Sequence, residues 1–159
     1  MTAGPHSPPD AQAAPPCPDD ATQTGLHGTS VAIDGRGVLI LGPSGAGKSS
    51  LALHLMAFGA RLVADDYTLI SRRAQALFAT CPPPLSGLIE ARGLGLLRAD
   101  PVPEAKIDLI VDLEHTENHR LPPHRSMSLL GLPIALVFKT EGSHFAAAIL
   151  HYIKAGRAE

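Results

Sequence analysis

A glycine-rich segment, Gly42-Pro43-Ser44-Gly45-Ala46-Gly47-Lys48-Ser49, constrains the fold of this chain more than any other feature. An apolar, β-branched run at 36–41 precedes it, and apolar positions at helical spacing follow it. Strand, glycine-rich loop and helix in this order form a phosphate-binding loop, in which backbone N–H groups converge on phosphate oxygens at a helix N-terminus. A glycine-rich turn that matches by chance is the alternative, and the flanking strand and helix argue against it.

The loop predicts that the chain binds ATP together with Mg²⁺. Lys48 would reach the β- and γ-phosphates, and the hydroxyl of Ser49 would join the Mg²⁺ shell. The expected nucleotide-binding residues are Gly42, Pro43, Ser44, Gly45, Ala46, Gly47, Lys48 and Ser49. The loop alone does not identify the group that receives the phosphate.

The pattern around the loop predicts one α/β domain with a mixed sheet and the site at one edge of that sheet. Runs at 31–33 and 36–41 flank Asp34-Gly35, which suits a two-residue hairpin turn, so the first two strands should be antiparallel. The helix after the loop should stop at Gly59. Further strands are expected at 61–64, 67–71, 107–113 and 134–138, no regular structure at 81–85, and a closing helix from an N-cap at Ser143 to about Gly156.

The first 25 residues have a different composition from the rest of the chain. Residues 2–25 hold six prolines and five alanines but no Leu, Ile, Val, Phe or Met. Such a segment buries too little apolar area to offset the entropy of ordering it. We therefore expect a disordered tail over 1–25 and a single folded domain over 26–156.

Charge and hydropathy exclude several classes of function. The chain has 13 Lys+Arg against 15 Asp+Glu, and its basic residues are scattered, which argues against nucleic acid or an anionic membrane as partner. It contains no uninterrupted apolar run of membrane-spanning length and no secretory leader pattern. Cys17 and Cys81 are expected to be free thiols in a reducing cytoplasm.

Two acidic segments lie downstream of the loop. Asp65-Asp66 ends a strand 17 and 18 residues after Lys48, where a carboxylate could hold Mg²⁺ or accept a proton from an attacking hydroxyl. The alternative is a solvated turn. The second segment, Glu90-Ala91-Arg92-Gly93-Leu94-Gly95, combines a hard oxygen ligand, a guanidinium and two glycines. The alternative is an ordinary loop with an exposed ion pair, which could have the same sequence.

Together these segments resemble the catalytic domain of HPr kinase/phosphorylase. The likeness is carried by Ser44-Gly45-Ala46-Gly47-Lys48-Ser49, Arg61-Leu62-Val63-Ala64-Asp65-Asp66, Pro83-Pro84-Leu85-Ser86 and Glu90-Ala91-Arg92-Gly93-Leu94-Gly95. It is strongest over 27–97 and weaker to about 138. The Glu-x-Arg-Gly-Leu-Gly stretch is the signature of that family and is more specific than the phosphate loop.

The resemblance implies a metal-dependent kinase that uses ATP to phosphorylate a serine of HPr, a small phosphocarrier protein. By residue, it implies that Asp66 is the general base toward the serine. Because neighbouring residues on a strand point to opposite faces, Asp65 is expected to have a different role. The resemblance also implies Ser49 and Glu90 as Mg²⁺ ligands. The remaining expected catalytic residues are His27, Lys48, Arg92, and Arg120, which would face the phosphoryl group. Family members form hexamers, so the resemblance also implies a homo-oligomer.

The chain departs from the family pattern in places. Only the expected tail precedes Leu26, where longer members have a separate domain, and this compact form resembles the version found in alphaproteobacteria. Phe138-Lys139-Thr140-Glu141-Gly142 stands where the family carries a Gly-Arg-Asn stretch linked to dephosphorylation, so the resemblance supports the kinase reaction and not its reverse. A small-molecule kinase and a non-catalytic ATP sensor are the alternatives. His115 and His119 have a possible zinc spacing, but they follow a strand into a polar turn.

Overall fold

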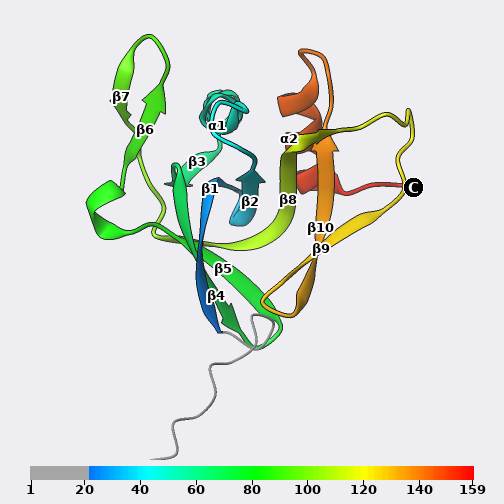
Figure 1. The fold of residues 1–159 in the computed structure, drawn as a ribbon, viewed down its shortest axis with the longest axis horizontal. Coiled ribbons are helices and arrows are strands. Elements are labelled where there is room, and N and C mark those ends of the chain that lie inside the picture. Colours follow the sequence, from blue (N-terminus) through cyan, green and yellow to red (C-terminus); the bar gives the residue numbers. More distant parts are fainter. Residues whose placement is uncertain (1–21) are drawn as a thin grey trace, which may run out of the picture.

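The computed structural model describes residues 22–159, so most of the expected tail lies outside the described residues. A mixed sheet of eight strands curls around one core, and two helices, α1 and α2, cover its other face (Figure 1). The strands of this sheet are β1 (Gln23–Ile33), β2 (Arg36–Leu41), β3 (Arg61–Ala64), β4 (Tyr67–Arg73), β5 (Ala76–Thr80), β8 (Glu104–Thr116), β9 (Arg125–Leu129) and β10 (Leu132–Lys139). A separate two-stranded hairpin consists of β6 (Leu88–Ala91) and β7 (Gly95–Arg98). The mixed α/β class is therefore confirmed.

Two long strands connect an antiparallel part of the sheet with a parallel part. The first half of β1 pairs with β4 and its second half pairs with β2, both antiparallel. The start of β8 pairs antiparallel with β5, and the rest of β8 runs parallel to β2 and β10. Because β2 pairs with both β1 and β8, strands β2, β1, β4, β5 and β8 form a closed ring of pairings. The carboxyl ends of the parallel strands β2, β8 and β10 lie together, beside α1 and α2 (Figure 1).

The hairpin and helix predicted around the glycine-rich loop are both present. Asp34 and Gly35 have φ values of 50° and 78°, as a two-residue turn between antiparallel strands requires, and Ile33 pairs with Arg36. Helix α1 (Lys48–Ala57) ends where Gly59 takes a φ of 103°, which glycine tolerates and other residues rarely adopt. The Asp34-Gly35 turn and Gly59 therefore mark the start of the strand before the loop and the end of the helix after it.

Several boundaries differ from the sequence-based expectation. β1 begins at Gln23, before the expected domain start, because backbone pairing with β4 over 23–27 needs no apolar side chains. Pro83–Leu85 forms a single 3₁₀ turn where no regular structure was expected. The N-cap of α2 (Phe145–Ala155) is His144 and not Ser143, because the carbonyl of His144 accepts the first helical hydrogen bond, from the N–H of Ala148. The expected end of this helix near Gly156 is confirmed.

Apolar side chains fill both faces of the sheet. Leu109 and Val111 of β8 face α1 and α2, whereas Ile107 and Ile110 belong to the core enclosed by the curled sheet. All four are at most 2% exposed, so β8 is buried on both sides. No helix in residues 22–159 is long and apolar enough to cross a bilayer.

Candidate active site

The glycine-rich loop connects the carboxyl end of β2 to the N-terminus of α1. Gly47 is the N-cap of α1 with a φ of 100°, and its carbonyl accepts the N–H of Leu51 at 2.9 Å. Gly42 lies close to β8, since a Cβ at this position would be 3.1 Å from the Cβ of Leu113. The loop thus directs the first N–H groups of a helix out of the carboxyl end of the sheet, as anion binding requires.

Lys48 lies across this loop. Its side chain is 8% exposed, and Nζ donates hydrogen bonds to the carbonyls of Gly42 at 2.8 Å and Pro43 at 3.2 Å. No carboxylate in residues 22–159 forms an ion pair with this ammonium group. Its positive charge is therefore available to an anion bound in the loop.

Asp65 is the centre of the site. It is 8% exposed and follows β3, and its Oδ1 accepts hydrogen bonds from Ser49 Oγ at 2.7 Å and Thr29 Oγ1 at 3.0 Å. Its Oδ2 accepts the backbone N–H of Glu90 at 2.9 Å. One carboxylate thus joins the phosphate loop, the aspartate pair and the Glu90 segment, three features that the sequence had placed separately.

Asp66 has a contrasting environment. It is exposed, its carboxylate makes no hydrogen bond or ion pair with the described residues, and its φ is 66°, in the left-handed region. Its backbone is held on both sides, because its carbonyl accepts the N–H of Gly28 at 3.0 Å and its N–H donates to Thr29 Oγ1 at 3.3 Å. The two aspartates therefore differ in their surroundings, since Asp65 is buried and hydrogen-bonded and the carboxylate of Asp66 is exposed.

His27 lies beside Asp66 on the other strand of the pair. It is exposed on β1 opposite Tyr67 of β4, and the two rings meet edge to face with centroids 5.5 Å apart. The next residue, Gly28, bonds to the carbonyl of Asp66. His27 and Asp66 are thus neighbours across the start of the β1–β4 pairing.

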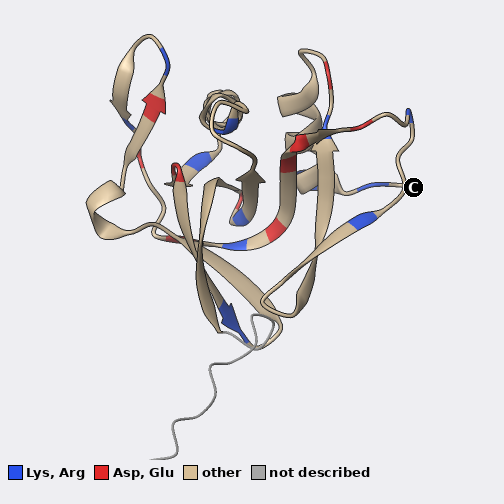
Figure 2. Cartoon of the chain, in the orientation of Figure 1, with Lys and Arg blue, Asp and Glu red and all other residues tan. Residues whose placement is uncertain are grey.

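Glu90 and Arg92 extend from the β6–β7 hairpin. Both are exposed, Glu90 on β6 and Arg92 in the turn that follows it. The carboxylate of Glu90 has no hydrogen-bond partner in the described part of the chain. Acidic residues lie near the ends of β6 and β8 in Figure 2, and basic residues are spread over several elements.

The oxygen donors around Ser49 suit a hard divalent cation such as Mg²⁺. Ser49 donates its only proton to Asp65, so its lone pairs are left for a metal. The side chains that could hold the ion are Ser49 and Glu90, with Asp65 fixing the serine from behind. Carboxylate and hydroxyl oxygens are the ligands that Mg²⁺ prefers, and the residues fit that ion.

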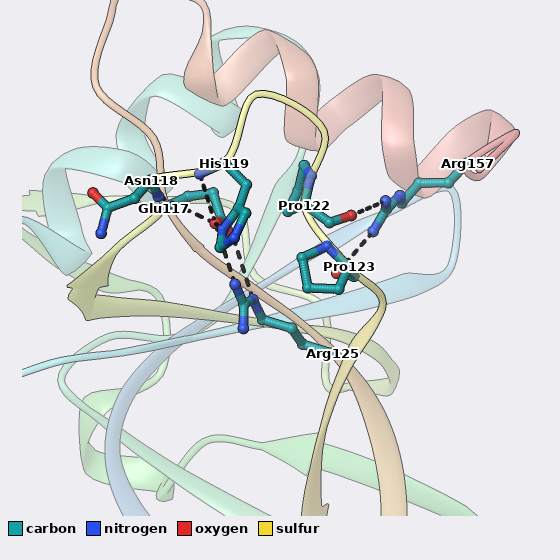
Figure 3. Close-up of polar contacts among 7 residues, drawn as sticks. All are labelled: Glu117, Asn118, His119, Pro122, Pro123, Arg125 and Arg157. Carbon is teal, nitrogen blue, oxygen red and sulfur yellow. Dashed lines mark hydrogen bonds and ion pairs between the residues drawn. The ribbon is translucent and has the colours of Figure 1, made fainter.

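Among the described residues, Arg120 is, like Arg92, an expected site residue that has no bond to this network. It is exposed on the loop between β8 and β9 and makes no hydrogen bond or ion pair within residues 22–159. The ends of this loop are fixed instead by Glu117 and Arg125 (Figure 3). Arg125 donates from two nitrogens to the two carboxylate oxygens of Glu117, both at 3.2 Å, and His119 also bonds to Glu117. Arg125 is the main cause that lowers the pKa of Glu117 to about 2.

A cavity of about 140 Å³ lies between this loop and α2. Its lining is largely apolar and aromatic and includes Phe138, Phe145 and Tyr152, and the Glu117–Arg125 pair also lines it. Arg157 closes one side by donating to the carbonyl of Pro122 at 2.6 Å (Figure 3). None of the predicted site residues lines this cavity.

Other polar residues near the site carry no motif in the sequence. Thr29 was a strand residue without a motif, although it bonds to both aspartates. Asp112 ends the buried part of β8 beside Leu41 and pairs with His115 at 2.7 Å. His115 and His119 bond to different carboxylates, so they do not form the shared zinc pair that their spacing would allow.

Burial, with the nearby charge of Asp65, raises the pKa of the free Cys81 thiol.

Comparison with known proteins gives consistent matches. The model of the HPr serine kinase C-terminal domain family matches residues 19–128. HPr kinase/phosphorylase of Aromatoleum aromaticum is 41% identical over 123 residues, which are 69% of this chain and 39% of that protein. HPr kinase/phosphorylase of Ralstonia nicotianae is 42% identical over 129 residues, 74% of this chain and 40% of that protein. The chain therefore spans about two fifths of the length of these relatives.

A solved structure shares the fold. The HPr(Ser) kinase/phosphatase of Coxiella burnetii superposes with a TM-score of 0.70 at 23% identity, over 82% of this chain and 94% of that one. At this identity the likeness concerns the arrangement of strands and helices.

Proposed function

This chain belongs to the HPr serine kinase C-terminal domain family, and on that premise we propose that it is an ATP- and Mg²⁺-dependent kinase that phosphorylates a serine of an HPr-type phosphocarrier protein. The observation that carries the proposal is the convergence on Asp65. Its carboxylate bonds to Ser49 of the phosphate loop and to the backbone of Glu90 in the family signature. A phosphate loop on an unrelated kinase would not need that link.

In the proposed mechanism, the loop and Lys48 bind the phosphates of ATP, and their positive charge and N–H dipoles stabilise the transferred phosphoryl group. Ser49 and Glu90 would hold Mg²⁺, which neutralises phosphate charge when bound. Asp66 accepts the proton of the acceptor serine as its oxygen bonds to the γ-phosphorus and the bond to the leaving ADP oxygen breaks. The exposed carboxylate of Asp66 supports this assignment, because a protein acceptor can reach it.

His27, Arg92 and Arg120 have supporting roles in this proposal. His27 stands beside Asp66 and can orient the acceptor hydroxyl, and Arg92 is exposed next to Glu90. Arg120 would have to approach the phosphoryl group with its loop when substrates bind. We also propose that the chain acts in the cytoplasm, where its acceptor would be found, as a homo-oligomer, and in the kinase direction only.

The test is transfer of labelled phosphate from ATP with Mg²⁺ to the purified phosphocarrier. The control acceptor carries alanine in place of the target serine, and free sugars and nucleotides serve as rival acceptors. Label on the parental carrier alone supports the proposal. Label on a small molecule would identify a small-molecule kinase, and ATP binding without any transfer would identify a sensor.

The Lys48→Ala variant is the matched enzyme control for this assay. Removing the ammonium group should abolish transfer by weakening phosphate binding, while the sheet keeps its core. Transfer at the parental rate by this variant would contradict the role of the glycine-rich loop. An unchanged thermal transition in the variant would show that the loss is not one of folding.

A further inference from the structure

Thr29 lies fully buried on β1 between the two aspartates. Its hydroxyl donates to Oδ1 of Asp65 at 3.0 Å and accepts the backbone N–H of Asp66 at 3.3 Å. A threonine hydroxyl has one proton and two lone pairs, so a single group can serve both contacts at once. No motif in the sequence marks this residue.

We propose that Thr29 is a positioning residue that sets the orientation of both aspartates, an inference that rests on the proposed function of the site. It is fully buried, and the hydrogen bonds of its hydroxyl within residues 22–159 are with Asp65 and Asp66 alone. Its effect on phosphoryl transfer must therefore pass through these two neighbours.

The effect on Asp65 follows from its hydrogen bonds. Oδ1 is shared by Thr29 and Ser49, and Oδ2 is held by the N–H of Glu90, so the carboxylate plane is fixed at both oxygens. That plane decides where the Ser49 proton points, and hence where its lone pairs face. Without the Thr29 hydroxyl, water could not readily replace the bond at a side chain that is 8% exposed, and the carboxylate could rotate.

The effect on Asp66 follows from its backbone. A non-glycine residue in the left-handed region is strained and persists only where its surroundings hold it. The Thr29 hydroxyl holds the N–H of Asp66, and Gly28 holds its carbonyl. Loss of the hydroxyl would leave that N–H without this partner and loosen the orientation of the Asp66 side chain just before β4.

A neighbouring hydroxyl provides a matched control. Ser30 follows Thr29 on β1 and is 1% exposed, but its Oγ bonds to Thr68 at 3.1 Å and to neither aspartate. Thr68 in turn donates to the carbonyl of Gly28 at 2.9 Å. Ser30→Ala therefore removes a buried hydroxyl from the same strand without touching the aspartates.

The experiment compares Thr29→Val, Thr29→Ala, Thr29→Ser and Ser30→Ala with the parental protein. Two readouts are measured, namely kcat and KM for the carrier, and the Mg²⁺ concentration that gives half-maximal binding of a fluorescent ATP analogue. We expect Thr29→Val and Thr29→Ala to lower kcat about 10-fold with KM for the carrier nearly unchanged, because a bond to a charged group is lost. Both should also raise the Mg²⁺ requirement.

Thr29→Ser keeps the hydroxyl and should restore both readouts, whereas Ser30→Ala should leave them near parental. If Thr29→Val fails to fold, the pair Thr29→Ala and Thr29→Ser still isolates the hydroxyl, since both lack the methyl group. Parental kcat and parental Mg²⁺ requirement in Thr29→Val or Thr29→Ala would overturn the inference. Equal losses in Thr29→Ser and Thr29→Ala would also overturn it, by tracing the effect to packing.

The two readouts separate this inference from the proposed function. If the parental protein transfers no phosphate to the carrier but the Mg²⁺ requirement shifts as expected, the kinase proposal fails and the positioning of Asp65 by Thr29 is supported. If the parental protein binds the nucleotide without any dependence on Mg²⁺, both are overturned.

Discussion

Asp65 and Asp66 are identical in type and adjacent in sequence, yet their surroundings are opposite. Asp65 is buried and accepts three hydrogen bonds, whereas the carboxylate of Asp66 is exposed and accepts none from the described residues. The buried, bonded carboxylate of Asp65 suits the proposed role of fixing Ser49. The exposed carboxylate of Asp66 suits the proposed role toward the acceptor serine, because a protein substrate can reach it.

We therefore expect the two aspartate-to-asparagine variants to lose different properties, namely phosphoryl transfer in one and Mg²⁺-dependent ATP binding in the other. Asp66→Asn should bind ATP with Mg²⁺ at near-parental affinity and lose on the order of 10²-fold or more in transfer, because the base is removed. Asp65→Asn should weaken Mg²⁺-dependent binding itself, since an amide nitrogen faces donors from Ser49, Thr29 or Glu90. Nucleotide titrations with and without Mg²⁺, followed by transfer rates, measure both effects.

Two results would contradict this division of roles. One is an Asp66→Asn variant that transfers phosphate at the parental rate while Asp65→Asn binds normally but is inactive, which would exchange the roles. The other is full activity in both variants, which would make the pair a structural turn.

At the residue scale, the sequence predicts those site residues that belong to a recognisable motif. The phosphate loop, Asp65-Asp66 and the Glu90 segment each carry a pattern, and the structure brings Ser49, Asp65 and the backbone of Glu90 into contact. Thr29 could not be predicted, because one threonine in an apolar strand is indistinguishable from a residue that only packs. The network of Arg125 was also hidden, since its partner Glu117 lies eight residues away across a loop.

At the scale of elements, the loop between β8 and β9 depends on one ion pair at its base. The pKa of Glu117 is about 2 in the folded protein, well below its ordinary value of 4.5, chiefly because of Arg125. Since the folded pKa is the lower one, this carboxylate stabilises the fold fully above about pH 4.5. The contribution is lost as the pH falls through the interval toward pH 2.

We expect Glu117→Gln to be less stable than the parental protein at pH 7, and the difference to shrink as the pH falls from about 5 to 3. Urea midpoints at pH 7, 5 and 3 measure this. Glu141→Gln is the control, because Glu141 is 76% exposed and its contact with Lys139 is 4.0 Å long. A difference between Glu117→Gln and the parental protein that stays constant over this pH range would refute the role of the charge.

Elements with a strong turn or a dense apolar run could be predicted, and weakly patterned ones could not. Asp34-Gly35 marks the turn between β1 and β2, and Gly59 marks the end of α1, because these residues adopt positive φ values. In β9, Met127 and Leu129 alternate with Ser126 and Ser128, which is too short an alternation to stand out. The β6–β7 hairpin was not predicted, because the glycines after Arg92 concealed the strands on either side.

At the scale of the whole molecule, β8 supplies both cores. Leu109 faces the helices and is fully buried, so Leu109→Ala should lower the free energy of unfolding by about 2–5 kcal/mol. Leu121→Ala is the matched control, because Leu121 is 78% exposed and should change it by at most about 0.5 kcal/mol. Denaturant unfolding measures both, and equal effects would contradict the assignment of β8 as the shared core strand.

The closed ring of strand pairings determines how backbone amides exchange with solvent deuterium. β2 and β8 each have partners on both sides, so neither can separate by fraying from a free margin. Their most protected amides should exchange only through global unfolding, whereas those of β6–β7, which pair only with each other, should exchange through cheaper local opening. Equal protection of the hairpin would argue against this hierarchy. The strand that presents the glycine-rich loop would thus stay ordered while the hairpin that carries Glu90 opens and closes beside it.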